Sequence, residues 1–166
     1  TAKAVNVLVT YSVTKTFTAL AVLQLVEQGK IDIEQPVINY LPEFPYPSEI
    51  TIRQLLNHSG GIPNPIPLSW IHLADVHESF DRNTFFNQIL NKNNKTKSPP
   101  NEKYAYSNLG YVLLGQLIEK VSKISYEEYI RANILDLLGI EKDEMDFTIT
   151  NTKQHAKGYH KKYSFL

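Results

Sequence analysis

The chain has 166 residues, of which 42% are hydrophobic and 20% are charged, proportions that are ordinary for a globular protein with one core. Its 17 basic and 17 acidic residues cancel, so no net charge attracts nucleic acid or an anionic membrane surface. The absence of cysteine excludes disulfides, thiolate metal sites and a thiol nucleophile, and no apolar run reaches the ~20 residues of a membrane span.

The first part of the chain predicts a strand followed by a long helix. Val5, Val7 and Val9 occupy alternate positions, as in a short strand that leads toward Ser12. From Val13 to Gln28 the apolar residues recur at helical spacing, and the glycine that follows is a natural stop. The residues expected on the apolar face of this helix are Phe17, Leu20, Ala21, Val22, Leu25 and Val26.

Short helices between loops are predicted next. Residues 30–47 are rich in proline and indicate an ordered loop, with at most a short helix around Val37 to Tyr40. Thr51 is of the N-cap type and predicts a short helix that ends near Asn57. The sequence His58-Ser59-Gly60-Gly61 then breaks that helix.

Three longer helices are predicted in the second half. Asp81 should cap a helix that runs to Leu90 and into the polar loop of residues 91–100. Ser107 or Asn108 begins a strongly apolar helical pattern.

The third of these helices covers Tyr126 to Leu138, with Ser125 as its cap and Gly139 as its stop. After Asp146, alternation of apolar residues favours a further strand. The expected architecture is therefore mostly helical, with strand remnants at both ends.

Ser12 and Lys15 lie three residues apart at the start of the first predicted helix, so they share one helix face. A serine hydroxyl is a weak nucleophile until a neighbouring base, such as a neutral amine, takes its proton. Taken alone, the pair has plainer interpretations, because serine is a preferred N-cap and a helical lysine is usually solvated.

A phenol and a carboxamide come together in a second place. If Tyr106 and Asn108 lie in an extended segment, residues two apart face the same side and both reach one cleft. Tyrosine is more often a half-buried packing residue, which is the role expected of Tyr104 and Tyr111. Asn108 has a competing interpretation as the cap of the helix that follows.

Three motifs occur in order along the chain. They are Ser12-Val13-Thr14-Lys15, then Leu55-Leu56-Asn57-His58-Ser59-Gly60-Gly61-Ile62, and then Tyr106-Ser107-Asn108 followed by Leu109-Gly110-Tyr111-Val112-Leu113-Leu114-Gly115. Together they resemble the serine β-lactamase family, in its class C branch. That branch also includes D-alanyl-D-alanine carboxypeptidases, D-aminopeptidases and esterases. The resemblance covers essentially the whole chain.

The fold implied by the resemblance is the α/β (α+β) β-lactamase/transpeptidase-like architecture, represented here mainly by its helical subdomain. Residues 1–11 would be a remnant strand, and residues 12–145 would form the active-site helix and the helical subdomain. Residues 146–166 would begin the return to the sheet.

The resemblance also implies roles for individual residues. Ser12 would attack a carbonyl to form an acyl-enzyme, and Lys15 would accept its proton. Tyr106 would carry protons to the leaving group and help to activate the hydrolytic water, while Asn108 would bind the amide oxygen of the substrate. The backbone N–H of Ser12 would supply one oxyanion donor. His58, in the second motif, would be structural.

One family element is missing from the sequence. The family carries a Lys-Thr-Gly or His-Thr-Gly strand that provides the second oxyanion donor, and no such tripeptide occurs here. The expectation is a central fragment of a longer enzyme that acts on a β-lactam, a D-amino-acid peptide or an ester, and that is inactive alone. The alternative is a non-catalytic ligand-binding or sensor module of the same fold.

Partners and cofactors follow from the same comparison. The resemblance implies a small-molecule or peptide substrate, no metal or organic cofactor, and export to the bacterial cell envelope or medium. His72 and His77, like His155 and His160, are spaced five apart, which is wrong for a pair of helical metal ligands, and are expected on the surface. The lysines of the polar loop lack interleaved aromatic residues, so no nucleic-acid site is predicted.

Overall fold

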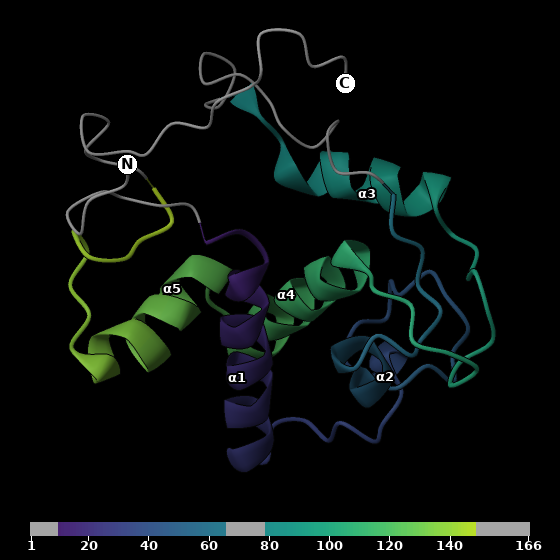
Figure 1. Cartoon of the computed structure of the whole chain (residues 1–166), viewed down its shortest axis with the longest axis horizontal. Helices are drawn as coiled ribbons and strands as arrows, with labels where there is room; N and C mark the ends of the chain where they lie inside the picture. Colours follow the sequence, from purple (N-terminus) through teal and green to yellow (C-terminus); the bar gives the residue numbers. More distant parts are fainter. Residues whose placement is uncertain (1–9, 66–78, 149–166) are drawn as a thin grey trace, which may run out of the picture.

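Helix α1 (Thr14–Glu27) runs through the centre of the computed structural model, which describes residues 10–65 and 79–148. Figure 1 shows α4 (Asn108–Ser122) beside α1, with α5 (Tyr126–Ile130) to one side and α2 (Ile52–Leu56) to the other. Helix α1 contacts α4 and α5, and α4 also contacts α2. Helix α3 (Arg82–Lys92) lies at the edge of this group.

Short helical turns precede α1, follow α5 and, in one case, lie between α1 and α2. They are η1 (Tyr11–Val13), η2 (Val37–Asn39), η5 (Arg131–Leu135) and η6 (Asp136–Leu138). Within the described ranges the only β pairing is an isolated antiparallel bridge between Pro36 and Thr51. The strand predicted around Val5 to Val9 and the four histidines considered as metal ligands lie outside the described residues. The helix-rich fold confirms the expected helical subdomain.

The core forms where the apolar faces of α1 and α4 meet. Helix α1 buries Thr18, Ala21, Val22 and Leu25, which recur every three or four residues. Helix α4 contributes a longer stripe of the same period: Leu109, Gly110, Leu113, Leu114, Leu117 and Ile118. The prediction that Leu20 belongs to this face is wrong, because Leu20 is 42% exposed on the opposite side of α1. Thr18 takes part in the buried stripe and bonds the Tyr126 hydroxyl at 2.8 Å.

The predicted helix caps are confirmed. Thr51 and Ser125 each accept a hydrogen bond from the third residue of their helix and complete a capping box. Asp81 accepts from two backbone N–H groups of α3, and Ser107 accepts from the Gly110 N–H. Each cap pairs backbone donors that the first helical turn leaves unbonded, which explains why these residues set the helix starts.

The predicted helix Tyr126–Leu138 is not a single α-helix. It is α-helical only to Ile130, then widens into the π turn η5 and tightens into η6 before Gly139 ends it at φ +69°. The Gln24 side chain of α1 donates to the backbone carbonyl of Asn133, in η5, at 2.8 Å. A carbonyl of the widened turn thus gains a hydrogen-bond donor from a neighbouring helix. Residues 146–148 form no strand, and the rest of the strand predicted there lies outside the described residues.

The turn after α2 is hydrogen-bonded to the loop that precedes α4. The carbonyls of the turn residues His58, Ser59 and Gly61 accept from the backbone N–H groups of Ala105, Asn101 and Lys97, at 2.8 Å in each case. The two segments therefore run side by side, and the turn fixes the path of the loop that leads to Tyr106 and Asn108. Gly61 makes the closest approach, because a Cβ at that position would lie 2.1 Å from the Ser98 carbonyl oxygen.

We call this hydrogen-bonded contact between the turn after α2 and the loop before α4 the clamp. The close approach at Gly61 within the clamp can be tested against a matched glycine. Gly61→Ala and Gly29→Ala both place alanine at a left-handed φ, +68° and +67° respectively. The conformational cost is about 1–2 kcal/mol in each. Gly29 has nothing within 4 Å of the added methyl, whereas Gly61 meets the Ser98 backbone. We expect Gly61→Ala to lower the free energy of unfolding in urea clearly more than Gly29→Ala does. Equal losses would show that the close approach contributes nothing.

Candidate active site

Ser12 lies in the turn η1, immediately before α1. The preceding residue, Tyr11, has a left-handed φ of +45°, an unfavourable conformation for a residue with a side chain. Ser12 is not the N-cap of either helix: Thr10 precedes η1, Val13 precedes α1, and neither makes a side-chain cap bond. The capping interpretation of Ser12 is therefore wrong, and its hydroxyl is available to other partners.

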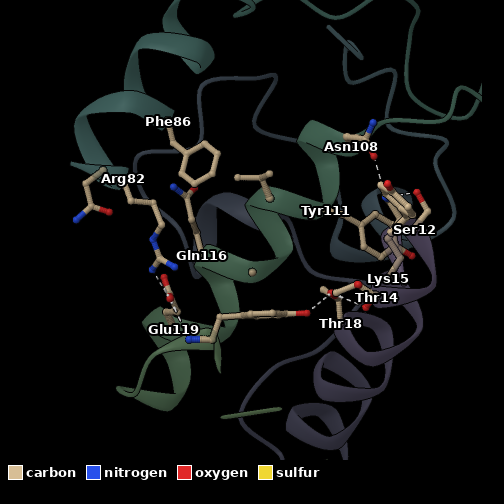
Figure 2. Close-up of a pocket in the computed structure, with 15 residues that line it drawn as sticks. Ser12, Thr14, Lys15, Thr18, Arg82, Phe86, Asn108, Tyr111, Gln116 and Glu119 are labelled. Atoms are coloured by element: carbon tan, nitrogen blue, oxygen red, sulfur yellow. Dashed lines mark hydrogen bonds and ion pairs between the residues drawn. The ribbon is translucent and has the colours of Figure 1, made fainter. Parts of the chain in front are cut away.

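Two of the predicted side chains contact this hydroxyl directly, and the fourth residue of the site, Asn108, bonds to both of them. The Ser12 Oγ lies 2.9 Å from the Tyr106 hydroxyl, and Lys15 Nζ donates to the same Oγ at 3.4 Å. Lys15 Nζ also donates to Asn108 Oδ1 at 2.8 Å, as Figure 2 shows, and the Tyr106 hydroxyl donates to that oxygen at 3.2 Å. The structure thus joins residues 12, 15, 106 and 108 in one hydrogen-bonded network.

Tyr106 and Asn108 are joined by the extended residue Ser107, and Asn108 is already the first residue of α4. Ser107 between them has φ −138° and ψ 120° and caps α4, so the cap is Ser107 and not Asn108. The Ser107 side chain is buried and also donates to the Pro63 carbonyl at 2.8 Å. Ser107 therefore anchors the segment, while the residues on either side of it turn toward Ser12 and Lys15.

Lys15 is the cation of this network. Among the described residues it forms no ion pair with a carboxylate, and its Nζ lies 5.0 Å from the Tyr106 ring centre and 5.6 Å from that of Tyr111. Burial by itself raises the pKa of the Tyr106 phenol. Interactions with Lys15 and Ser12 outweigh this effect, so the pKa lies below its ordinary value. A phenol of lowered pKa gives up its proton more readily.

Sequence reasoning missed Asn64, which holds Asn108 in place. Asn64 Oδ1 accepts from the Asn108 backbone N–H at 2.9 Å and from its side-chain Nδ2 at 3.1 Å. These bonds turn the Asn108 carboxamide so that Oδ1 faces Lys15 and Tyr106. Asn64 lies in a proline-rich stretch of irregular backbone, where no helical or strand period marks which side chains point inward.

His58 lies under the site, between aromatic rings. Its Nδ1 accepts from the Ser107 backbone N–H at 3.2 Å, and its ring centre is 4.6 Å from that of Tyr106 and 5.0 Å from that of Tyr111. Burial, with a smaller contribution from the Lys15 charge, lowers the pKa of His58. The packing role expected of Tyr111 is confirmed, but Tyr104 is 70% exposed and touches only the edge of the histidine.

A cavity of about 480 Å³ opens beside the network. Ser12, Lys15 and Asn108 line one end of it, and Arg82 and Glu119 line the other, as Figure 2 shows. The described residues contain no group of three or more histidine, aspartate or glutamate side chains placed to hold a metal ion. The groups that surround the Ser12 hydroxyl are the Lys15 amine, the Tyr106 phenol and the Asn108 amide.

Comparison with known proteins identifies the family of the chain. The family model described as Beta-lactamase matches residues 4–164. Penicillin-binding protein 4* of Bacillus subtilis is 39% identical over 124 residues, which is 74% of this chain but 27% of that protein. The chain therefore spans little more than a quarter of that relative's length.

Solved structures give the same result for the fold. A D-stereospecific amidohydrolase from Streptomyces sp. aligns with a TM-score of 0.64 at 31% identity, over 77% of this chain and 41% of that one. The octameric penicillin-binding protein homologue from Pyrococcus abyssi aligns with a TM-score of 0.59 at 35% identity, over 77% of this chain and 30% of that one. No helix in the described ranges combines the length and apolarity required to span a membrane.

The influence of Lys15 on Tyr106 can be measured directly. Lys15→Met removes the charge but keeps a chain of similar length, so we expect the pKa of Tyr106 to rise. A titration followed by NMR of ¹³C-labelled tyrosine would report it. Lys30→Met, three residues beyond the C-terminal end of α1, is the control and should leave the titration unchanged. An unaltered Tyr106 pKa in Lys15→Met would mean that the amine does not act on the phenol.

His58 should make stability depend on pH. Its folded pKa lies below the ordinary value of about 6.5, so the unfolded chain takes up the proton first as the pH falls. We expect the free energy of unfolding contributed by this residue to be complete above pH 6.5 and to decrease as the pH falls from there toward the folded pKa. His58→Asn tolerates the left-handed φ of 60° and keeps an acceptor, so it should abolish this dependence. The same slope in both proteins would contradict the assignment.

Proposed function

The chain belongs to the β-lactamase family, and on that premise we propose that it carries the catalytic centre of a serine hydrolase that works through an acyl-enzyme at Ser12. The observation that supports this most strongly is the convergence of Ser12 and Lys15 with Tyr106 and Asn108, which are more than 90 positions away along the chain. A nucleophile within hydrogen-bonding distance of a base, itself held by further groups, is the arrangement that covalent acyl transfer requires.

The first step is acylation. The Ser12 oxygen bonds to the carbonyl carbon of the substrate, and the hydroxyl proton passes to the network. The 2.9 Å contact with Tyr106 is shorter than the 3.4 Å contact with Lys15, which favours the phenol oxygen as the immediate acceptor. For this step Tyr106 acts as its phenolate, whose negative charge Lys15 stabilises until the Ser12 proton arrives and makes the phenol neutral. This is a different division of roles from direct proton transfer to the amine.

Collapse of the tetrahedral intermediate breaks the bond from the carbonyl carbon to the leaving nitrogen or oxygen. The leaving atom takes the proton that Tyr106 holds, and the acyl group stays on Ser12. Water then attacks the ester with Tyr106 again accepting a proton, and the proton returns to the Ser12 oxygen as the acid product leaves. Every proton removed in acylation is thus returned, and the network ends as it began.

Asn108 and the backbone N–H of Ser12 are proposed to bind the substrate. One Asn108 Nδ2 hydrogen is engaged by Asn64, which leaves the second to donate to an amide oxygen of the substrate. The Ser12 N–H would contribute one donor to the oxyanion. We propose that a Lys-Thr-Gly or His-Thr-Gly strand of the natural gene product supplies the other, since the chain spans 27% of its Bacillus relative.

The substrate class is an amide, an ester or a β-lactam. The similarity to a D-stereospecific amidohydrolase supports an amide of a D-amino acid within this range. A relative that is a penicillin-binding protein supports a place in the exported proteins of the bacterial cell envelope. A non-catalytic binding module of the same fold is the competing function, and acylation separates the two.

Intact-mass spectrometry tests the proposal. We expect the natural gene product, incubated with benzylpenicillin or p-nitrophenyl acetate, to gain the mass of the acyl group on Ser12, and Ser12→Ala to gain none. Tyr106→Phe should slow acylation by about 100- to 10,000-fold, because it removes the proton carrier. Tyr104→Phe, two residues earlier and 70% exposed, is the matched control and should react at the normal rate.

Two results would overturn this assignment. An adduct on another residue would show that Ser12 is not the nucleophile. Binding of penicillin without any gain of covalent mass would favour the non-catalytic module.

A further inference from the structure

The cavity beside Ser12 extends well beyond the four residues of the network. It lies between α1, α3 and α4, and Tyr106 is not among its lining residues. Asn108 at one end and Glu119 at the other are eleven positions apart on α4, which is about 16 Å at 1.5 Å per residue. Its volume of about 480 Å³ is within the range of small-molecule sites. The cavity is therefore larger than the reacting carbonyl group of a substrate would need.

The walls of the cavity are mainly carbon. Tyr111, Val112 and Gly115 face it from α4, and Phe86 faces it from α3. Gly115 widens the cavity, because the position has no side chain and the only atom within 4 Å of an added Cβ is Tyr126 Cδ2, at 3.7 Å. An apolar group that enters here leaves water without losing hydrogen bonds.

The far end is closed by charges that are already paired. Arg82 donates to Glu119 at 2.6 Å and to Glu127 at 3.3 Å. Glu119 also accepts from the Tyr126 backbone N–H at 3.0 Å. One cation and two carboxylates leave a net negative charge, so this end repels a ligand that terminates in a carboxylate. Arg82 and Glu119 are already paired with each other, and the mainly carbon walls that lead to them favour a neutral apolar chain over a charged one.

We propose that this cavity is an acyl-group subsite, and that it selects substrates whose acyl part is an extended, uncharged alkyl or arylalkyl chain. The chain would lie along α4 from Asn108 toward Glu119, with its carbonyl carbon at Ser12. The inference rests on the proposed acyl transfer at Ser12 and adds the substrate class. The acyl group moves from the leaving alcohol or amine to the Ser12 oxygen, with no other reactant.

A pair of esters and a glycine series test the subsite on the natural gene product. For p-nitrophenyl hexanoate and acetate, we expect the ratio of kcat/KM values to be about 100 in favour of the longer chain. Gly115→Leu places a side chain in the cavity and should reduce that ratio at least about tenfold, with Gly115→Ala between the two.

Gly110→Ala is the matched control. It makes the same change in the same helix, its added methyl meets only ordinary contacts at 3.7 Å and beyond, and it does not line the cavity. It should leave the ester ratio unchanged. Thermal unfolding of each variant separates blocked binding from loss of fold, and leucine or alanine at position 115 is expected to preserve the helix.

Binding without reaction provides an independent readout. Hexanamide cannot acylate the enzyme at an appreciable rate, and it should shift the Val112 methyl signals in NMR spectra of methyl-labelled protein. Gly115→Leu should abolish that shift, and Gly110→Ala should keep it.

The outcomes separate this inference from the proposed function. Acylation by acetate, with an ester ratio near one that Gly115→Leu does not change, would overturn the subsite and leave the hydrolase intact. No acylation by either ester, with a hexanamide shift that Gly115→Leu removes, would overturn the hydrolase and retain the apolar ligand site. Absence of both acylation and shift would overturn both.

Discussion

The clamp between the turn after α2 and the loop before α4 is the constraint on which the site depends. Three backbone hydrogen bonds from that loop to the turn bring Ala105 against His58 and Lys97 against Gly61. Backbone bonds of this kind fix direction as well as position, because each pairs one donor with one acceptor. Tyr106 follows directly after the last of them, so its hydroxyl reaches Ser12 only when the clamp is intact.

In the hydrogen-bonded network of the site, Lys15 is the one cation, and the side chains that contact it are neutral. Lys15 donates to Asn108 and Ser12, while two tyrosine rings lie beside its ammonium group. With no carboxylate paired to Lys15 in the described part of the chain, its charge acts on the phenol and the imidazole instead. At Tyr106 the interactions with Lys15 and Ser12 outweigh burial and lower the pKa, and at His58 the charge of Lys15 adds to the lowering of the pKa that burial causes. The neutral imidazole can then accept the Ser107 N–H that positions the segment.

Local features of this fold could be predicted from the residues themselves, and the meeting of the Ser12 and Tyr106 motifs was expected only through the family resemblance. Other features set by distant packing could not be predicted. Ser125 and Asp81 mark helix starts because a cap bonds backbone within three residues of itself. The outward direction of Leu20 depends on which side of α1 its neighbours cover, and helical spacing alone does not determine that. Asn64 is the clearest case, since its function comes entirely from a partner 44 positions away.

Helix α4 places the residues that stabilise the core on one side and residues that line the cavity on the other. Leu113 and Leu117 point into the core, while Val112, Gly115 and Glu119 line the cavity from the other side of the helix. Gly115 has no side chain to lose, so a substitution at this position changes what the cavity admits without removing a core contact. The first turn of the same helix carries Asn108, whose orientation depends on bonds at the helix start and not on either face. One helix can thus keep its packing and its carboxamide fixed while the shape of the cavity varies.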